Sequence, residues 1–65
     1  MSFKAAREKA GLSIVQVAAK MGVSDVAVFY WESGKNMPKT SSLAKLAKLY
    51  GVTVDELLTS EQEQN

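Results

Sequence analysis

Apolar residues recur every three or four positions along most of the chain, the spacing that places them on one side of an α-helix. Four glycines, at positions 11, 22, 34 and 51, divide this pattern into intervals. Glycine readily adopts the left-handed conformation that ends a helix, so the intervals predict short helices with defined ends. The pattern therefore predicts an all-α fold of five helices.

The first two helices have recognisable beginnings. One is predicted from about Ser2 to Ala10. Its inward side is predicted to consist of Phe3, Ala6 and Ala10. The second follows Ser13, which can exchange hydrogen bonds with Gln16 in a capping box. The inward side of this second helix is predicted to consist of Val17, Ala18 and Met21.

The other three helices are bounded in a similar way. A third helix is predicted from Ser24, a favourable N-cap residue, to about Ser33. A polar loop containing Pro38 cannot continue that helix, and a fourth helix starts near Thr40. A second capping box at residues 53–56 starts the fifth helix. The fourth helix is predicted to bury Leu43, Leu46, Ala47 and Tyr50.

The length of 65 residues allows one domain with one small core. We place this domain at residues 1–59, because the sequence from residue 60 onward offers no apolar side chain to bury. Residues 60–65 are expected to form a polar, frayed tail. Met1 and this tail favour a complete protein over a fragment. A core of this size often depends on a partner subunit for its stability.

The composition argues against several classes of protein. The chain has no cysteine and no histidine, which excludes disulfides, thiolate or imidazole metal sites, and Ser–His or Cys–His nucleophiles. It also lacks a glycine-rich phosphate loop, so we expect no enzymatic activity, no cofactor and no metal. No apolar run is long enough for a membrane span, and no secretory signal is present. A cytoplasmic protein without a membrane partner is expected.

Charge is distributed unevenly along the chain. The net charge is only +1, but residues 1–50 hold all eight basic residues and three of the seven acids, a net charge of +5. The remaining acids are Asp55, Glu56, Glu61 and Glu63. This asymmetry is suited to a protein whose residues 1–50 face a polyanion while its C-terminal end points away from it. An ordinary solvated surface explains the same charges equally well.

A tight turn at residues 21–24, Met-Gly-Val-Ser, joins the second and third helices and is the local signature of a helix-turn-helix. A longer series of residues resembles the Cro and lambda-repressor family of bacterial and phage regulators, also termed XRE-type regulators. This series is Gly11-Leu12-Ser13, Val17-Ala18, Met21-Gly22-Val23-Ser24, Val28, Glu32-Ser33-Gly34-Lys35, Pro38, Leu46-Ala47, Gly51-Val52 and Glu56-Leu57-Leu58. The resemblance covers residues 3–58 and implies a compact lambda-repressor-like domain that binds double-stranded DNA.

The outward side of the third helix selects bases if that helix enters the major groove. With Val28 and Trp31 inward, the base-facing residues are predicted to be Asp25, Val26, Phe29 and Tyr30. In one interpretation the apolar pair packs on thymine methyl groups, Asp25 accepts a hydrogen bond from cytosine, and the Tyr30 hydroxyl binds a base or a phosphate. In a second, the stripe binds a protein. In a third, the face is rotated and Phe29 belongs to the core.

Phosphate contacts are predicted for Ser13, Ser24, Ser33, Lys35 and Lys39. Both Ser13 and Ser24 lie at helix N-termini, where hydroxyls and amides bind phosphate oxygens. Both lysines match positions at which family members contact phosphate, and each is equally consistent with a solvated charge. Arg7 and Glu32 match a family pair, which implies a partly buried ion pair between the first helix and the end of the third.

The resemblance also implies a dimer surface around the fifth helix. Candidate contacts are Leu49, Val54, Leu57 and Leu58, some of which must instead belong to the core. The sequence thus favours a sequence-specific transcription regulator, a homodimer that represses from a palindromic operator. The rival hypothesis is a protein-interaction or antitoxin-like module that uses the apolar stripe of the third helix. Salt discriminates between them, because phosphate contacts weaken steeply as salt rises.

Overall fold

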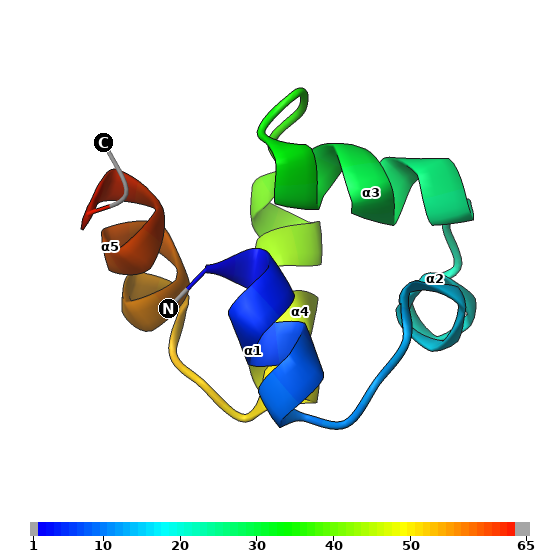
Figure 1. Ribbon diagram of the computed structural model, residues 1–65, viewed down its shortest axis with the longest axis horizontal. Coiled ribbons are helices and arrows are strands. Elements are labelled where there is room, and N and C mark those ends of the chain that lie inside the picture. The colour runs from blue at the N-terminus through cyan, green and yellow to red at the C-terminus, as the bar shows by residue number, and fades with distance from the viewer. Residues whose placement is uncertain (1, 64–65) are drawn as a thin grey trace.

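The computed structural model describes residues 2–63, which form five helices and no strand (Figure 1). The helices are α1 (Phe3–Lys9), α2 (Ile14–Met21), α3 (Asp25–Ser33), α4 (Thr40–Tyr50) and α5 (Val54–Glu63). The predicted all-α fold is confirmed. Each of the first four helices lies within about one residue of its predicted bounds, because the capping residues that define those bounds act locally.

Side-chain caps begin four of the five helices. The hydroxyls of Ser2, Ser13 and Ser24 each accept a hydrogen bond from the backbone amide three residues later. At Ser13 the capping box is complete, since the Gln16 side chain also accepts from the Ser13 amide at 2.8 Å. The same reciprocal arrangement links Thr53 and Glu56 at α5. The hydrogen bond that the Thr53 amide donates to the Glu56 carboxylate lowers the pKa of that carboxyl.

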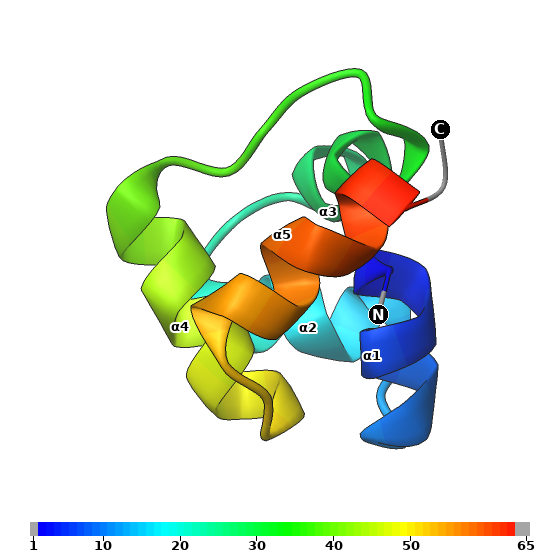
Figure 2. The same cartoon turned by 90° about the vertical axis from the view of Figure 1, so that its left-hand side faces the viewer.

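The five helices enclose one core. α1 and α4 lie side by side, α5 and α2 lie on opposite sides of this pair, and α3 spans one end of the molecule (Figures 1 and 2). The largest fully buried side chains, one from each helix, are Phe3, Val17, Val28, Leu46 and Leu57. Burying a side chain of this kind contributes about 1.5–3 kcal/mol, so the loss of any one helix would open the core.

Three details differ from the sequence prediction. Ala10 is exposed, not inward, because it is the C-cap residue of α1 and lies beyond the last turn that packs on the core. Pro38, expected only to interrupt a helix, is buried. The backbone of α5 remains helical to Glu63, where a frayed tail from residue 60 was expected, and glutamate and glutamine are good helix formers. Residues 64–65 of that tail lie outside the described part.

Over residues 2–63, the longest helix is α4 with 11 residues, and none has the length and apolar character needed to cross a membrane.

The turn between α2 and α3 depends on one left-handed residue. Gly22 has φ +70°, and a Cβ placed there would meet no atom within 4 Å. The effect of Gly22→Ala is therefore conformational, and we expect it to lower the free energy of unfolding by about 1 kcal/mol. Gly22→Asn should cost less, because asparagine tolerates the left-handed region. Urea denaturation followed by circular dichroism measures both values, and an alanine variant as stable as the asparagine variant would contradict this account.

Candidate nucleic-acid interface

The turn that joins α2 to α3 is held by short-range hydrogen bonds. Gly22 caps α2, and the Val23 amide donates to the Ala18 carbonyl at 3.0 Å. Ser24 then begins α3 by accepting from the Ala27 amide at 3.1 Å. Among the described helices, α2 and α3 pack against each other most extensively, so the turn joins two helices that are in direct contact.

The two sides of α3 differ in exposure. Val28 and Trp31 are buried, as predicted, whereas Val26 and Phe29 are 54% and 55% exposed. The interpretation in which Phe29 belongs to the core is therefore wrong. Asp25 is exposed and Tyr30 is half-buried, so all four predicted base-facing residues reach the surface. α3 presents to solvent an outward stripe that is apolar at its centre.

Aromatic and basic side chains meet at the C-terminal end of α3. The Lys35 ammonium lies 4.6 Å from the centre of the Tyr30 ring, a cation–π contact that holds this lysine beside the stripe. The Phe29 and Tyr30 rings are 6.2 Å apart between centroids and inclined at 48°. Lys39, at the start of α4, is exposed as well. The loop after α3 therefore offers two positive charges on the same end of the molecule.

The three serines predicted to bind phosphate differ in their hydrogen bonding. Ser13 and Ser24 both accept a backbone hydrogen bond through Oγ, which leaves the hydroxyl hydrogen available for another acceptor. The Ser33 hydroxyl instead donates to the Tyr30 carbonyl at 3.2 Å. A phosphate contact donated by Ser33 would have to break that bond. Ser13 and Ser24 are thus the better-placed donors.

Arg7 and Glu32 form the ion pair that the sequence implies. Arg7 Nε donates to Glu32 Oε2 at 2.6 Å, and Arg7 Nη2 donates to Oε1 at 3.1 Å. A third bond, from Nη1 to the Leu12 carbonyl at 3.0 Å, ties the pair to the loop before α2. The side chains are only 11% and 8% exposed. The pair therefore connects α1, the α1–α2 loop and the end of α3.

The surroundings of this pair fix its charge state. Hydrogen bonding to Glu32 raises the pKa of the Arg7 guanidinium further above its already high value. Burial raises the pKa of the Tyr50 phenol to about 12, and the nearby Glu32 acts in the same direction. Tyr50 is consequently neutral and Arg7 charged across the physiological range. Arg7 therefore keeps the positive charge that it brings to the pair.

A shallow hollow of about 270 Å³ adjoins the outward stripe. It is lined by Lys4, Arg7, Ile14, Phe29, Glu32 and Ser33. Sequence reasoning assigned no role to Lys4, because its place beside Phe29 arises only when α1 packs against α3. The exposed Lys4 side chain adds a third basic group near the stripe.

The arrangement of two helices, a tight turn and an outward-facing second helix agrees with the comparison to known proteins. The sequence profile of the helix-turn-helix family matches residues 3–57. The chain belongs to this family. Its members of the Cro and lambda-repressor type are DNA-binding transcription regulators and are generally not enzymes.

One relative of this helix-turn-helix chain is the HTH-type transcriptional activator BcrR of Enterococcus faecalis. The two are 45% identical over 47 residues, which cover 72% of this chain and 23% of BcrR. The chain thus matches less than a quarter of that relative's length. No solved structure matches the chain.

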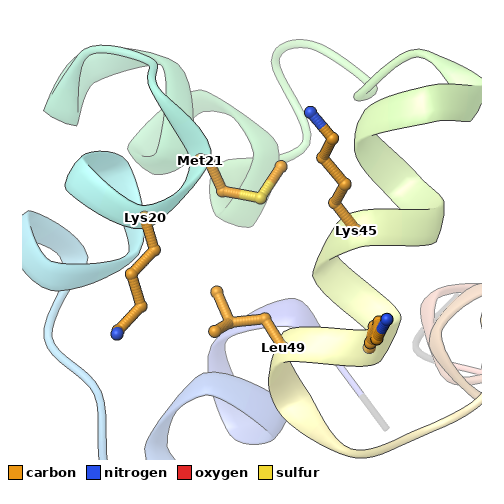
Figure 3. Close-up of a pocket in the computed structure, with 5 residues that line it drawn as sticks. Lys20, Met21, Lys45 and Leu49 are labelled. Carbon is orange, nitrogen blue, oxygen red and sulfur yellow. The ribbon is translucent and has the colours of Figure 1, made fainter.

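The four residues proposed for a helix-turn-helix dimer do not lie in one patch. Leu57 is completely buried, so it is one of the candidates that belong to the core. Val54 and Leu58 are half-buried on α5. Leu49 is also half-buried but lines a separate hollow between α2 and α4 (Figure 3). Leu49 therefore lies apart from the two partly exposed residues of α5.

Two exposed apolar residues were missed by sequence reasoning. Val15, in the first turn of α2, and Met37, in the loop after α3, are both well exposed. The position of Val15 outside the inward stripe of α2 was a usable signal, whereas Met37 lies in a loop without periodicity. Among residues 2–59, whose side chains the structure describes, no group of Asp or Glu is arranged to hold a metal ion.

The Arg7–Glu32 pair can be tested by removing one or both partners. Arg7→Ala leaves the largely buried Glu32 carboxylate unpaired, and we expect it to lower the free energy of unfolding by about 3–5 kcal/mol. The double variant Arg7→Met, Glu32→Leu removes both charges and should regain most of that loss.

Thermal and urea denaturation provide the measurement, with Lys4→Ala on the same helix as an exposed control expected to change stability by less than about 0.5 kcal/mol. If Arg7→Ala behaves like this control, the pair does not fasten α3.

Proposed function

We propose that this protein is a sequence-specific regulator of transcription that inserts α3 into the major groove of double-stranded DNA. The observation that carries the proposal is the outward stripe of α3, where Val26 and Phe29 remain more than half exposed in a helix whose other side is fixed in the core. Direct reading of base edges requires an exposed helix of this kind that is held in place by the helix before it, here α2.

Groups suited to the DNA backbone lie at both ends of this stripe. The exposed Ser13 and Ser24 begin α2 and α3, where amide groups and the positive end of the helix dipole favour a phosphate. Lys35 and Lys39 follow the other end of α3. We infer that these four residues set the register of α3 in the groove, since backbone contacts position a protein without selecting bases.

The stripe itself supports a preference for thymine. Val26 and Phe29 have no hydrogen-bonding side-chain groups, so their favourable partner in the major groove is the thymine C5-methyl group. Asp25 repels phosphate but accepts a hydrogen bond from the amino group of cytosine. The Tyr30 hydroxyl supplies one further polar contact to a base or a phosphate. We expect an operator half-site that combines thymines with a cytosine.

Two copies on a palindromic operator complete the proposal. A single short α3 contacts few bases, and related regulators gain affinity by placing two copies about one helical turn apart. We propose repression by occupancy, although the relative from Enterococcus faecalis is named an activator. Occupancy of a promoter requires only the DNA-binding surface described above. Such a protein acts where bacterial or phage DNA is located, in the cytoplasm.

The second candidate function is a protein-interaction or antitoxin-like module. The same exposed Val26 and Phe29 favour it, because apolar side chains one helical turn apart often mark a protein-binding face. In that case binding would depend mainly on apolar contact. Salt would then have little effect on affinity.

DNA binding is tested by selecting bound sites from random double-stranded DNA and titrating the best site with salt. We expect a two-fold symmetric motif and an affinity that falls with a log–log slope of about −0.9 per contacted phosphate. Only the two charged contacts of each copy, Lys35 and Lys39, release counterions, so we expect a slope of roughly −2 for one half-site. Failure to enrich any sequence, or a slope near zero, would reject the proposal and favour the protein-interaction module.

The reading of methyl groups is tested with the selected site itself. Replacing one contacted thymine by uracil removes only a methyl group, and we expect affinity to fall about fourfold, the equivalent of about 0.8 kcal/mol. Val26→Ala should reduce this thymine-to-uracil difference. Val15→Ala, which shortens an exposed valine on α2 instead, should leave it unchanged. Equal affinity for the two DNAs with the unaltered protein would contradict the assignment.

A further inference from the structure

A second hollow, of about 240 Å³, lies between α2 and α4 (Figure 3). It is lined by Lys20, Met21, Lys45, Lys48 and Leu49. Met21 and Leu49 are half-buried and point toward the space between the two helices, where they form an apolar floor. The three lysines are exposed around it. The hollow therefore combines an apolar surface with three positive charges.

The charge of these lysines is not neutralised by the helices that carry them. Neither α2 nor α4 contains an acidic residue. None of the three lysines forms an ion pair with an acid within residues 2–59. Lys45 and Lys48 stand three positions apart on α4, so they are neighbours on its surface and repel each other. The charge is therefore available to a partner from outside the chain.

The helix ends account for two of the three lysines. Lys20 and Lys48 lie in the last turns of α2 and α4, where the negative end of the helix dipole favours a cation. Lys45 lies about one turn earlier in α4 and does not benefit from that effect. It instead adds repulsion to Lys48, which an acidic ligand would relieve. Lys45 is consequently the lysine that points most directly to a ligand.

The chemistry and the size of the hollow indicate what kind of occupant fits. An apolar floor among unpaired ammonium groups is complementary to an occupant that carries both apolar side chains and carboxylates. A nucleic-acid phosphate would satisfy the lysines but would not cover Met21 and Leu49. The volume is below the usual range of about 300–1,000 Å³ for small-molecule pockets, which favours side chains presented by a protein surface. An amphipathic helix presents such side chains when it lies in a groove between two helices.

The hollow is separate from the other surfaces of this chain. The proposed DNA contacts use none of its five residues, and the outward stripe of α3 does not line it. α5 of the same copy carries acids, but it packs on α1 and α4, whereas the hollow opens between α4 and α2 (Figures 1 and 3). α4 thus lies between α5 and the hollow. A partner can therefore bind here while α3 is in contact with DNA.

We propose that the hollow between α2 and α4 is a docking site for an acidic amphipathic helix of a different protein. Its apolar side chains cover Met21 and Leu49, and its carboxylates pair with Lys20, Lys45 and Lys48. The inference goes beyond the proposed function, because it adds a protein contact that leaves the DNA-binding surface free. The interface is small and its charges lie at the rim, so binding is weak and decreases as salt rises. Neighbouring sites on DNA would strengthen it through effective concentration.

The probe is a synthetic helical peptide of about 15 residues with leucines along one face and glutamates beside them. Two-dimensional NMR of the nitrogen-labelled 65-residue chain at low salt locates its binding site. We expect saturable shifts of the Met21 and Leu49 amides and of their neighbours. A control peptide with glutamine in place of every glutamate should bind at least about tenfold more weakly. Absence of saturable shifts at the hollow, shifts centred on the outward stripe of α3, or equal binding of the two peptides would each overturn the proposal.

Charge reversal at the hollow provides the second arm. Lys45→Glu should weaken binding of the acidic peptide by about fivefold or more. The matched control is Lys9→Glu on α1, an exposed position away from the hollow where the net charge changes by the same amount. Its affinity for the peptide should remain within about twofold of that of the unaltered chain. Circular dichroism verifies that both variants fold, and equal losses in the two variants would reject the site.

The same variants test the other possible occupants of the hollow. We expect Lys45→Glu and Lys9→Glu to bind the selected DNA equally. A specific loss of DNA affinity in Lys45→Glu would assign the hollow to DNA and overturn the proposal. Shifts of Met21 and Leu49 that grow with protein concentration, without any peptide, would assign it to a second copy and equally overturn the proposal. Peptide binding is measured without DNA, so its result is independent of whether the proposed DNA-binding function holds.

Discussion

The orientation of α3 depends on the buried contact between Arg7 and Glu32. Two hydrogen bonds join the guanidinium to the carboxylate, and a third reaches the Leu12 carbonyl, so a single side chain links α1, the following loop and α3. A buried ion pair adds little net stability compared with apolar residues of the same size. Its geometry is specific, however, because the planar guanidinium donates two parallel hydrogen bonds to a carboxylate in one arrangement. The contact thus sets which side of α3 faces the core more than it sets how stable the domain is.

The surface chemistry of α3 follows from that constraint. With Glu32 directed to Arg7 and with Val28 and Trp31 buried, Val26, Phe29 and Tyr30 lie on the other side of the helix and reach the surface. Hydrophobicity alone does not explain this outcome, since the stripe that faces water is as apolar as the one that is buried. The helix is held by its specific contacts on one side, which allows bulky apolar residues to remain exposed on the other. Bulky apolar side chains that remain exposed to water are typical of a surface that binds a partner.

Features set by local interactions could be predicted from the sequence, and those set by tertiary packing could not. Serine caps and terminal glycines determine helix ends within a few residues, so the bounds of α1 to α4 agree closely. The adjacent Leu57 and Leu58 have equal hydrophobicity, and only the packing of α5 shows that the first is core and the second partly exposed. Leu49 faces α2 for the same reason, and the basic hollow exists only because α2 and α4 pack together. The Arg7–Glu32 pair came from the family pattern, since two residues 25 positions apart in the sequence give no local signal.

Trp31 is the only tryptophan in the chain, and it lies buried in α3 next to Glu32. Its indole ring is therefore sensitive to how α3 packs on the core, the packing that holds the proposed DNA-reading helix in place. Intrinsic fluorescence of the unmodified protein consequently reports on the seating of α3 without an attached dye. Ligands that bind far from α3 would leave the Trp31 emission unchanged. A change in this emission would therefore indicate a change at α3 itself.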